Sequence, residues 1–272
     1  MFLTDLMSNS YLKKIIKSTL YKWFLNQKGS FKYYGERVFF PKNSTTFNLA
    51  IRDGIYEQDV LKFINEFVKD HSVYIDIGAN IGLMSIPVLK KHPTVKTLSF
   101  EASPNTFKYL KRTWENSGVK DRWIIYNNAV SDTNAEIDFY TTTDADGAYE
   151  SIKDTKRVHF SGKISVQGIT IDEAWTRLNS PPVSFIKSDI EGADLLALQG
   201  AQNCINECRP RILLEWNKIN IKAFQLDHSD LISFCSNNKY KCYAVPSLIA
   251  IADATELELH SVVTENFLLI PA

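Results

Sequence analysis

The chain has 272 residues, of which 44% are hydrophobic and 23% are charged. This composition provides enough apolar residues for a large buried core and excludes the class of disordered proteins. Lysine plus arginine equals aspartate plus glutamate, at 31 each, so the chain lacks the overall positive charge of a dedicated nucleic-acid-binding protein. The length is that of one large α/β domain with additions.

Cysteine spacing and the first residues bear on the location of the protein. The four cysteines form neither a CxxC pair nor a zinc-finger pattern, and four in a chain of this length do not indicate a disulfide framework. No run approaches about eighteen consecutive apolar residues, the length that a membrane-spanning helix needs. Asp5 precedes the first lysine, and the apolar run of a secretory signal is missing. We therefore expect a cytoplasmic location and no transmembrane segment.

Residues 1–55 are predicted to form an N-terminal extension to a main domain of residues 56–272. Within residues 11–25, apolar side chains at helical spacing are interspersed with lysines, which is typical of an amphipathic basic helix. Such a helix either packs on the main domain as a lid or docks on a membrane surface or a partner. Residues 35–54 contain two short β-rich runs around a Pro/Asn/Ser cluster, a pattern that predicts a hairpin.

From residue 56 onward, apolar runs alternate with segments of helical periodicity. Five strands are predicted at residues 73–78, 95–101, 122–130, 183–189 and 211–216. Helices are predicted at residues 56–70, 104–118 and 193–207. This alternation predicts an α/β fold with a Rossmann-like, doubly wound and mostly parallel sheet, because helices then cross over between parallel strands.

Two further β-rich regions interrupt or follow this alternation. Residues 131–171 change to strand-like patterns around a polar stretch, DADGAYES, and are predicted to form a β-rich insertion or flap. Loops on a rigid scaffold commonly recognise ligands, so this insertion is a candidate for specificity. Residues 239–245 and 265–272 supply two more β-like runs, which are predicted to close the sheet as an antiparallel edge pair.

The stretch VYIDIGANIGLMS predicts a strand, a tight turn and a helix. Gly78 and Gly82 allow a backbone to approach closely, and Asn80 tolerates left-handed geometry. A nucleotide-like ligand therefore fits beside Gly78, Ala79 and Asn80, next to the free N–H groups of the following helix. Asp76 at the strand end is placed to orient this turn or to accept a hydrogen bond from the amino group of a methionine moiety. A glycine-rich turn without a ligand is the alternative.

The next two strands end in residues that suit a nucleoside. SFEASP places Glu101, followed by Ala102, at the carboxyl edge of the adjacent strand, where a carboxylate can accept both hydroxyl protons of a ribose. The glycine turn lacks the GxGxxG pattern of dinucleotide-binding proteins, which favours S-adenosylmethionine over NAD. YNNAVSD then places Asn128 and Ala129 where they can line an adenine slot.

FIKSDIEGAD is the fourth segment with chemistry. The two-residue period of a strand puts Lys187 and Asp189 on one face, pointing to the mouth of the sheet. These two residues either serve the reaction or form only a structural ion pair. Glu191 is predicted at the start of the next helix, where the helix dipole favours a negative charge.

IDIGANIG, FEASP, NNAVSD, TIDE, FIKSDIEGAD and RPRILLEW together resemble the FkbM-type methyltransferase family, over roughly residues 54 to 217. The resemblance implies a Rossmann-like fold, S-adenosylmethionine as cofactor and O-methylation of sugars or of hydroxyls on natural products. The usual second acid after EGA is the shorter Asp194, and the usual FE-P-N run is Phe100-Glu101-Ala102-Ser103-Pro104-Asn105. Neither departure points to a particular acceptor.

Methyl transfer to a hydroxyl needs alignment of donor and acceptor and a base for the hydroxyl proton. Asp189 is the first candidate for this base and Glu215, at the end of LLEW, is the second; Lys187 is placed to orient Asp189 or to bind an acceptor oxygen. Either carboxylate could instead bind the cofactor. The scattered histidines do not indicate a metal site, although Asp189 and Glu191 could hold magnesium.

Two other functions remain open from the sequence. One is a nicotinamide-dependent oxidoreductase on a similar sheet, and the other is a non-catalytic scaffold that docks through its basic helix. The expected partners of the methyltransferase are a small-molecule, sugar or glycan acceptor and no nucleic acid, with peripheral membrane contact possible through the N-terminal helix.

Overall fold

The computed structural model describes residue 25, residues 27–142, residue 147 and residues 149–272. The predicted basic helix therefore lies outside the described residues, apart from Leu25. Within the described ranges, none of the helices has the length and apolar character needed to cross a membrane. The cytoplasmic location and the division at residue 55 stay predictions.

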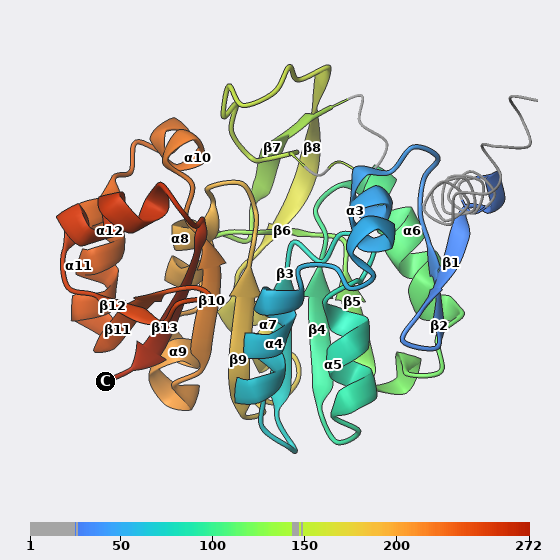
Figure 1. Ribbon diagram of the computed structural model, residues 1–272, viewed down its shortest axis with the longest axis horizontal. Coiled ribbons are helices and arrows are strands. Elements are labelled where there is room, and N and C mark those ends of the chain that lie inside the picture. The colour runs from blue at the N-terminus through green and yellow to red at the C-terminus, as the bar shows by residue number, and fades with distance from the viewer. Residues whose placement is uncertain (1–24, 26, 143–146, 148) are drawn as a thin grey trace, which may run out of the picture.

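An eight-stranded sheet runs through the middle of the molecule, with strand order β12-β11-β13-β10-β9-β3-β4-β5 (Figure 1). Its parallel part consists of β3 (Val73–Ile77), β4 (Lys96–Phe100), β5 (Trp123–Tyr126), β9 (Val183–Ser188) and β10 (Arg211–Glu215). The antiparallel edge consists of β11 (Tyr240–Ala244), β12 (Ile249–Ile251) and β13 (Asn266–Pro271). The prediction of a mostly parallel sheet with an antiparallel edge is confirmed, and β12 adds a third strand to the expected pair.

Side chains alternate along each strand, so apolar residues point to both faces of this sheet. Helices cover both faces. In β3, Ile75 packs toward one face, together with α7 (Ile171–Thr176), α8 (Asp194–Gln199), α9 (Gln202–Cys208) and α11 (His228–Asn238). Tyr74 packs toward the other, together with α4 (Gln58–Phe67) and α5 (Ser85–Lys91). The remaining helices are α6 (Pro104–Glu115), α10 (Lys218–Ala223), α12 (Ala254–Ser261) and a 3₁₀ turn (Lys120–Arg122). The fold is therefore doubly wound, as predicted.

The N-terminal hairpin differs from the prediction. It consists of β1 (Ser30–Tyr33) and β2 (Glu36–Phe39), and the second predicted strand is instead the helix α3 (Thr45–Asp53). The strand prediction was wrong because Ser44 caps a helix: its side-chain oxygen accepts a hydrogen bond from the Phe47 backbone N–H at 2.9 Å. Phe47 then stacks on Phe40 at 3.8 Å between ring centroids and joins a core shared with α5 and α6.

The insertion forms a small sheet of its own above the central sheet (Figure 1). Its strands are β6 (Ala129–Val130), β7 (Glu136–Thr141) and β8 (Gly162–Ile169). β7 pairs with β8 in antiparallel orientation, and β8 pairs with β6 in parallel orientation. The predicted strand 122–130 is thus two strands, and its second part joins the insertion to the carboxyl end of β5.

We predict that Gly82→Ala lowers the free energy of unfolding by roughly 2 to 4 kcal/mol, from backbone strain and overpacking together. Gly82 has φ +94°, and an added Cβ would lie 2.7 Å from the buried ring of Trp123. Gly35→Ala is the matched control, because Gly35 has φ +86° with open space around it and should lose only about 1 to 2 kcal/mol. Urea unfolding of both variants measures the difference; equal losses would contradict the packing role of Gly82.

Candidate functional site

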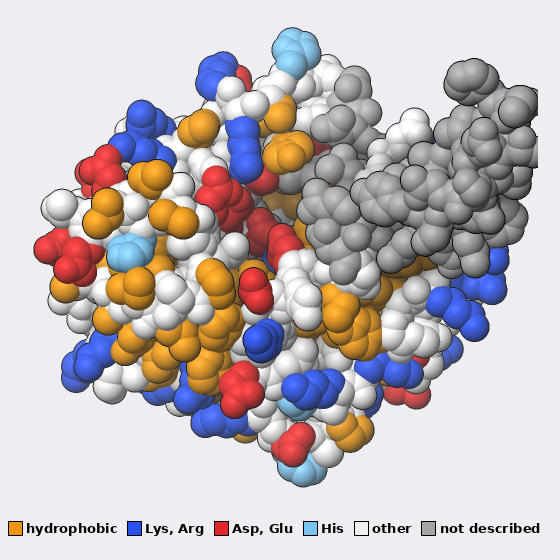
Figure 2. All heavy atoms as spheres, in the orientation of Figure 1, with side chains coloured by type: hydrophobic (Ala, Val, Ile, Leu, Met, Phe, Trp, Pro, Cys, Tyr) orange, Lys and Arg blue, Asp and Glu red, His pale blue; other side chains and the backbone are white. Residues whose placement is uncertain are grey.

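A cavity opens at the carboxyl ends of β3, β4 and β9, with about 880 Å³ of empty space including its mouth. That volume lies within the range of small-molecule sites, about 300 to 1,000 Å³. The chain continues from β3 to β4 in one direction along the sheet, whereas β9 and β10 lie in the other. Such a switch point is where open α/β sheets bind ligands. Figure 2 shows acidic side chains gathered in the middle of this face.

The glycine turn after β3 forms one wall of the cavity. Gly78 and Ala79 donate backbone hydrogen bonds to the Phe100 carbonyl at 3.0 and 2.9 Å, so the turn is fastened to β4. A Cβ on Gly78 would lie 2.0 Å from the carbonyl oxygen of Asp189. Gly78 is therefore required by packing between two strand ends, and Gly82 by packing on Trp123; Gly82 is not among the lining residues.

Glu101 links the glycine turn to the start of α6. Its carboxylate accepts the backbone N–H groups of Asn80 and Ser103, each at 2.9 Å. Only 8% of Glu101 is exposed, and burial raises the pKa of its carboxyl to about 7. Glu101, Asn80 and Ala102 all line the cavity, as predicted for neighbours of a ligand; that Glu101 binds a ribose stays a prediction.

Asp76 lies beneath the cavity and is fully buried. Its Oδ2 accepts a hydrogen bond from Ser85 at 2.5 Å, Ser85 pairs with Ser99 at 2.7 Å, and Trp123 donates its indole N–H to Ser99 at 2.7 Å. Asp76 Oδ1 has no hydrogen-bond partner among the described residues. Burial raises the pKa of the Asp76 carboxyl despite the attraction of Lys187. Asp76 is not among the lining residues of the cavity, and the Tyr74 hydroxyl also acts on its carboxyl.

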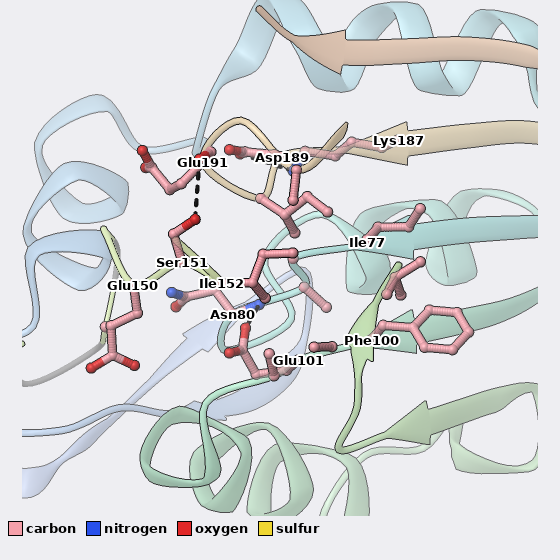
Figure 3. Close-up of a pocket in the computed structure, with 18 of the residues that line it drawn as sticks. Ile77, Asn80, Phe100, Glu101, Glu150, Ser151, Ile152, Lys187, Asp189 and Glu191 are labelled. Carbon is pink, nitrogen blue, oxygen red and sulfur yellow. Dashed lines mark hydrogen bonds and ion pairs between the residues drawn. The ribbon is translucent and has the colours of Figure 1, made fainter. Parts of the chain in front are cut away.

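Lys187 and Asp189 meet at the end of β9, as their spacing predicts (Figure 3). The Lys187 ammonium lies 3.1 Å from Asp189 Oδ2; the lysine side chain is 4% exposed and the aspartate side chain 32%. Burial by itself would raise the pKa of Asp189, but the Lys187 charge, hydrogen bonds from Glu215 and Lys187, and the Arg157 charge together outweigh it, so that this pKa lies below its usual value. The same attraction raises the pKa of Lys187. Both residues line the cavity as an ion pair, with the carboxylate toward solvent.

Glu215, at the end of β10, has a pKa that is shifted in the direction opposite to that of Asp189. Burial, followed by repulsion from Asp189 and Glu191, holds the pKa of its carboxyl well above the usual range. Its side chain is 14% exposed and lies 3.6 Å from the Arg157 guanidinium. Glu215 is not among the lining residues of the cavity. The pKa of Glu215 is thus shifted upward, whereas that of the neighbouring Asp189 is shifted downward.

Glu191 is in the turn between β9 and α8, and the prediction that it begins the helix was wrong. It has φ +54°, and α8 starts at Asp194, whose buried carboxylate accepts the Ser188 hydroxyl at 2.6 Å. Asn220 donates to Glu191 Oε2 at 2.7 Å, and burial raises the pKa of Glu191 to about 7. The Glu191 carboxylate is thus stabilised by side chains from other elements and not by a helix dipole.

Asn128 and Ala129 line the opposite end of the cavity, together with Phe139 of the insertion. Asn128 uses its amide N–H to donate to the Gln167 carbonyl of β8 at 3.1 Å. This end is thus built partly by the insertion. Within the described ranges, no three His, Cys, Asp or Glu side chains are arranged to hold a metal ion.

A family model for the methyltransferase FkbM domain matches residues 76–242. The chain belongs to this family. The matched segment begins at Asp76 and includes every site residue predicted from the sequence. It also contains the whole insertion.

Individual relatives of this FkbM domain are more distant. The chain is 28% identical over 153 residues to the 2-O-methyltransferase NoeI of Sinorhizobium fredii, covering 52% of this chain and 62% of the relative. It is 28% identical over 156 residues to the hexuronic acid methyltransferase AglP of Haloferax volcanii, covering 57% and 60%. The alignments thus span less than two thirds of either relative. A crystal structure of methyltransferase FkbM from Methylobacillus flagellatus aligns with 13% identity and a TM-score of 0.44, over 94% of this chain and 60% of the other.

Several residues of the FkbM domain's cavity were missed from the sequence. Thr46 and Tyr56 line it from the N-terminal region, before the segment that matches the family. Ser151 and Ile152 line it from the insertion, and Ser151 donates to the Glu191 carbonyl at 3.2 Å (Figure 3). The polar stretch DADGAYES predicted a flap, but no sequence pattern indicated its contact with Glu191.

We predict that Glu101→Ala lowers the free energy of unfolding by about 2 to 4 kcal/mol, because two backbone N–H groups lose the carboxyl that accepts their hydrogen bonds. Chemical denaturation measures the loss. The control is Glu115→Ala, at an exposed residue of α6. It should change stability by no more than about 0.5 kcal/mol. Wild-type stability of Glu101→Ala would show that this carboxylate does not hold the turn.

Proposed function

We propose that this chain is an S-adenosylmethionine-dependent O-methyltransferase that acts on a hydroxyl of a sugar, glycan or natural product. The observation that carries the proposal is a partly exposed Asp189, paired with Lys187, in the same cavity as the glycine turn and the buried Glu101. The names of NoeI, a 2-O-methyltransferase, and AglP, a hexuronic acid methyltransferase, support a sugar hydroxyl as the acceptor.

The residues of the cavity fit S-adenosylmethionine. Glu101 would accept the ribose hydroxyls, since each carboxylate oxygen holds one backbone N–H and has capacity for another donor. Asp76 is fully buried and is not among the lining residues of the cavity, so its proposed contact with the amino group of the methionine moiety rests on its place near the end of β3. Asn128, Ala129 and Phe139 would border the adenine. When bound, this cofactor supplies an electrophilic methyl group.

Asp189 is the proposed base for the acceptor hydroxyl. Its pKa below the usual value keeps it ionised at neutral pH, and its 32% exposed side chain is open to the cavity. Lys187 holds Oδ2 and thereby fixes the orientation of the carboxylate. Glu215 is less suited to this role because its raised pKa favours the protonated carboxyl and because it does not line the cavity. Alignment of the acceptor in the cavity would supply much of the remaining acceleration.

The other parts of the proposal concern context. The absence of a nucleic-acid partner is supported by the zero net charge of the chain, and the small acceptor and the cytoplasmic location remain proposals. Contact with a membrane surface through the basic N-terminal residues, and a domain boundary near residue 55, also remain proposals.

We predict that Asp189→Asn slows methyl transfer by roughly a hundredfold or more, the usual scale for a general base, with little change in cofactor affinity. Glu215→Gln, at a residue that does not line the cavity, should retain most activity. The assay follows labelled methyl from S-adenosylmethionine to methyl glucoside and methyl glucuronide, and calorimetry with S-adenosylmethionine and with NAD measures binding.

Three results would contradict this assignment. Binding of NAD in place of S-adenosylmethionine would reject the proposed function. A parallel loss of cofactor affinity and turnover in Asp189→Asn would make Asp189 a cofactor ligand. Near-normal turnover in Asp189→Asn together with a severe loss in Glu215→Gln would make Glu215 the base.

A further inference from the structure

Arg157 connects the insertion to the acidic end of the cavity. It lies between β7 and β8 and its guanidinium is 3.0 Å from Glu191 Oε2, 3.6 Å from Glu215 Oε1 and 3.9 Å from Glu265 Oε2. The three glutamates come from the turn after β9, the end of β10 and the segment before β13. One side chain of the insertion thus contacts three separate parts of the sheet's carboxyl edge.

Burial makes this contact different from the other ion pairs of the insertion. The side chains of Arg157, Glu191 and Glu215 are 25%, 9% and 14% exposed. Lys156, the preceding residue, is 82% exposed and pairs with Asp154 inside the insertion. Exposed pairs contribute little to stability, whereas removing one partner of a buried pair leaves an uncompensated charge. The buried contact therefore holds the insertion in place.

A second contact ends on the same turn. Ser151 donates to the Glu191 backbone carbonyl, and Ser151 and Ile152 form part of the cavity wall opposite Asp189 (Figure 3). Displacement of the insertion would therefore move this wall as well. The two contacts are independent, since one uses the side chain of Glu191 and the other its backbone.

We propose that Arg157 is a positioning residue: by holding Glu191 and Glu215 it fixes the insertion over the carboxyl ends of β9 and β10 and so builds the acceptor side of the cavity beside Asp189. This inference rests on the proposed methyl transfer. Arg157 is occupied by carboxylates of the protein, so it does not bind an acidic group of the acceptor. Neutral and acidic acceptors depend on it equally.

The charge of Arg157 also acts on Asp189. Besides Arg157, the groups that face Asp189 are Lys187, Tyr74, Asp76, Glu57, Glu191, Asp194 and Glu215. Arg157 and Lys187 lower the pKa of Asp189, while burial raises it. A reaction that needs ionised Asp189 is lost as pH falls through this pKa, so loss of Arg157 moves the acid limb of the pH–rate profile to higher pH.

The experiment compares Arg157→Ala, Arg157→Lys and the control Lys156→Ala with the wild type. In Arg157→Ala, KM should rise about tenfold or more for both methyl glucoside and methyl glucuronide, the scale of a lost charge-assisted contact. S-Adenosylmethionine affinity should stay within about twofold, since its proposed contacts lie elsewhere. The acid limb should shift to higher pH. Arg157→Lys should restore part of the acceptor affinity, and Lys156→Ala should match the wild type.

Backbone hydrogen exchange tests the contact without any acceptor. Arg157→Ala should speed exchange in residues 149–161 and around Glu191, whereas Lys156→Ala should leave both unchanged. Unaltered exchange in Arg157→Ala would overturn the proposal. If the wild type is active, an unaltered KM and an unaltered pH profile in Arg157→Ala would overturn it as well. Loss confined to methyl glucuronide would also overturn it and make Arg157 an acceptor-binding residue. Absence of S-adenosylmethionine binding by the wild type would instead reject the proposed function, and the exchange result would still decide the contact.

Discussion

The buried ammonium of Lys187 is the constraint on which the site depends. Lys187 pairs with Asp76 in the register between β9 and β3, and its ammonium lies 3.1 Å from Asp189. A charge this far from water is costly unless opposite charges surround it. Asp76 supplies such a charge from the neighbouring strand β3, and Asp189 supplies one from the segment directly after β9. The sheet register and the burial of Lys187 thus place one carboxylate below the cavity and one at its edge.

That arrangement shifts the pKa values of Asp189 and Glu215 in opposite directions. Lys187 lowers the pKa of Asp189, whereas burial and the Asp189 charge raise the pKa of Glu215. Carboxyl groups whose surroundings push their pKa values apart can take different roles in proton transfer. Arg157 joins the same network from the insertion. The cavity is therefore a single electrostatic unit built from the parallel strands and closed by the insertion.

The sequence predicted the features that depend on local pattern. Buried parallel strands are continuous apolar runs, so the strand ends that carry Glu101 and Asp189 could be placed. Contacts between distant segments could not be predicted. No sequence pattern connects Arg157 with Glu215, and glycine is needed at position 82 because the Trp123 ring fills the space that a side chain would occupy. The helix α3 was missed because a short β-rich composition outweighed the capping signal of Ser44.

The most direct test of this account is the carboxyl ¹³C NMR titration of the protein labelled at aspartate and glutamate, with Asp189→Asn and Glu215→Gln used to assign the two resonances. We predict that Asp189 remains ionised at neutral pH and takes up its proton only below the usual range of an aspartate, while Glu215 takes up its proton well above the usual range of a glutamate. A protonated Asp189 beside an ionised Glu215 at neutral pH would contradict it.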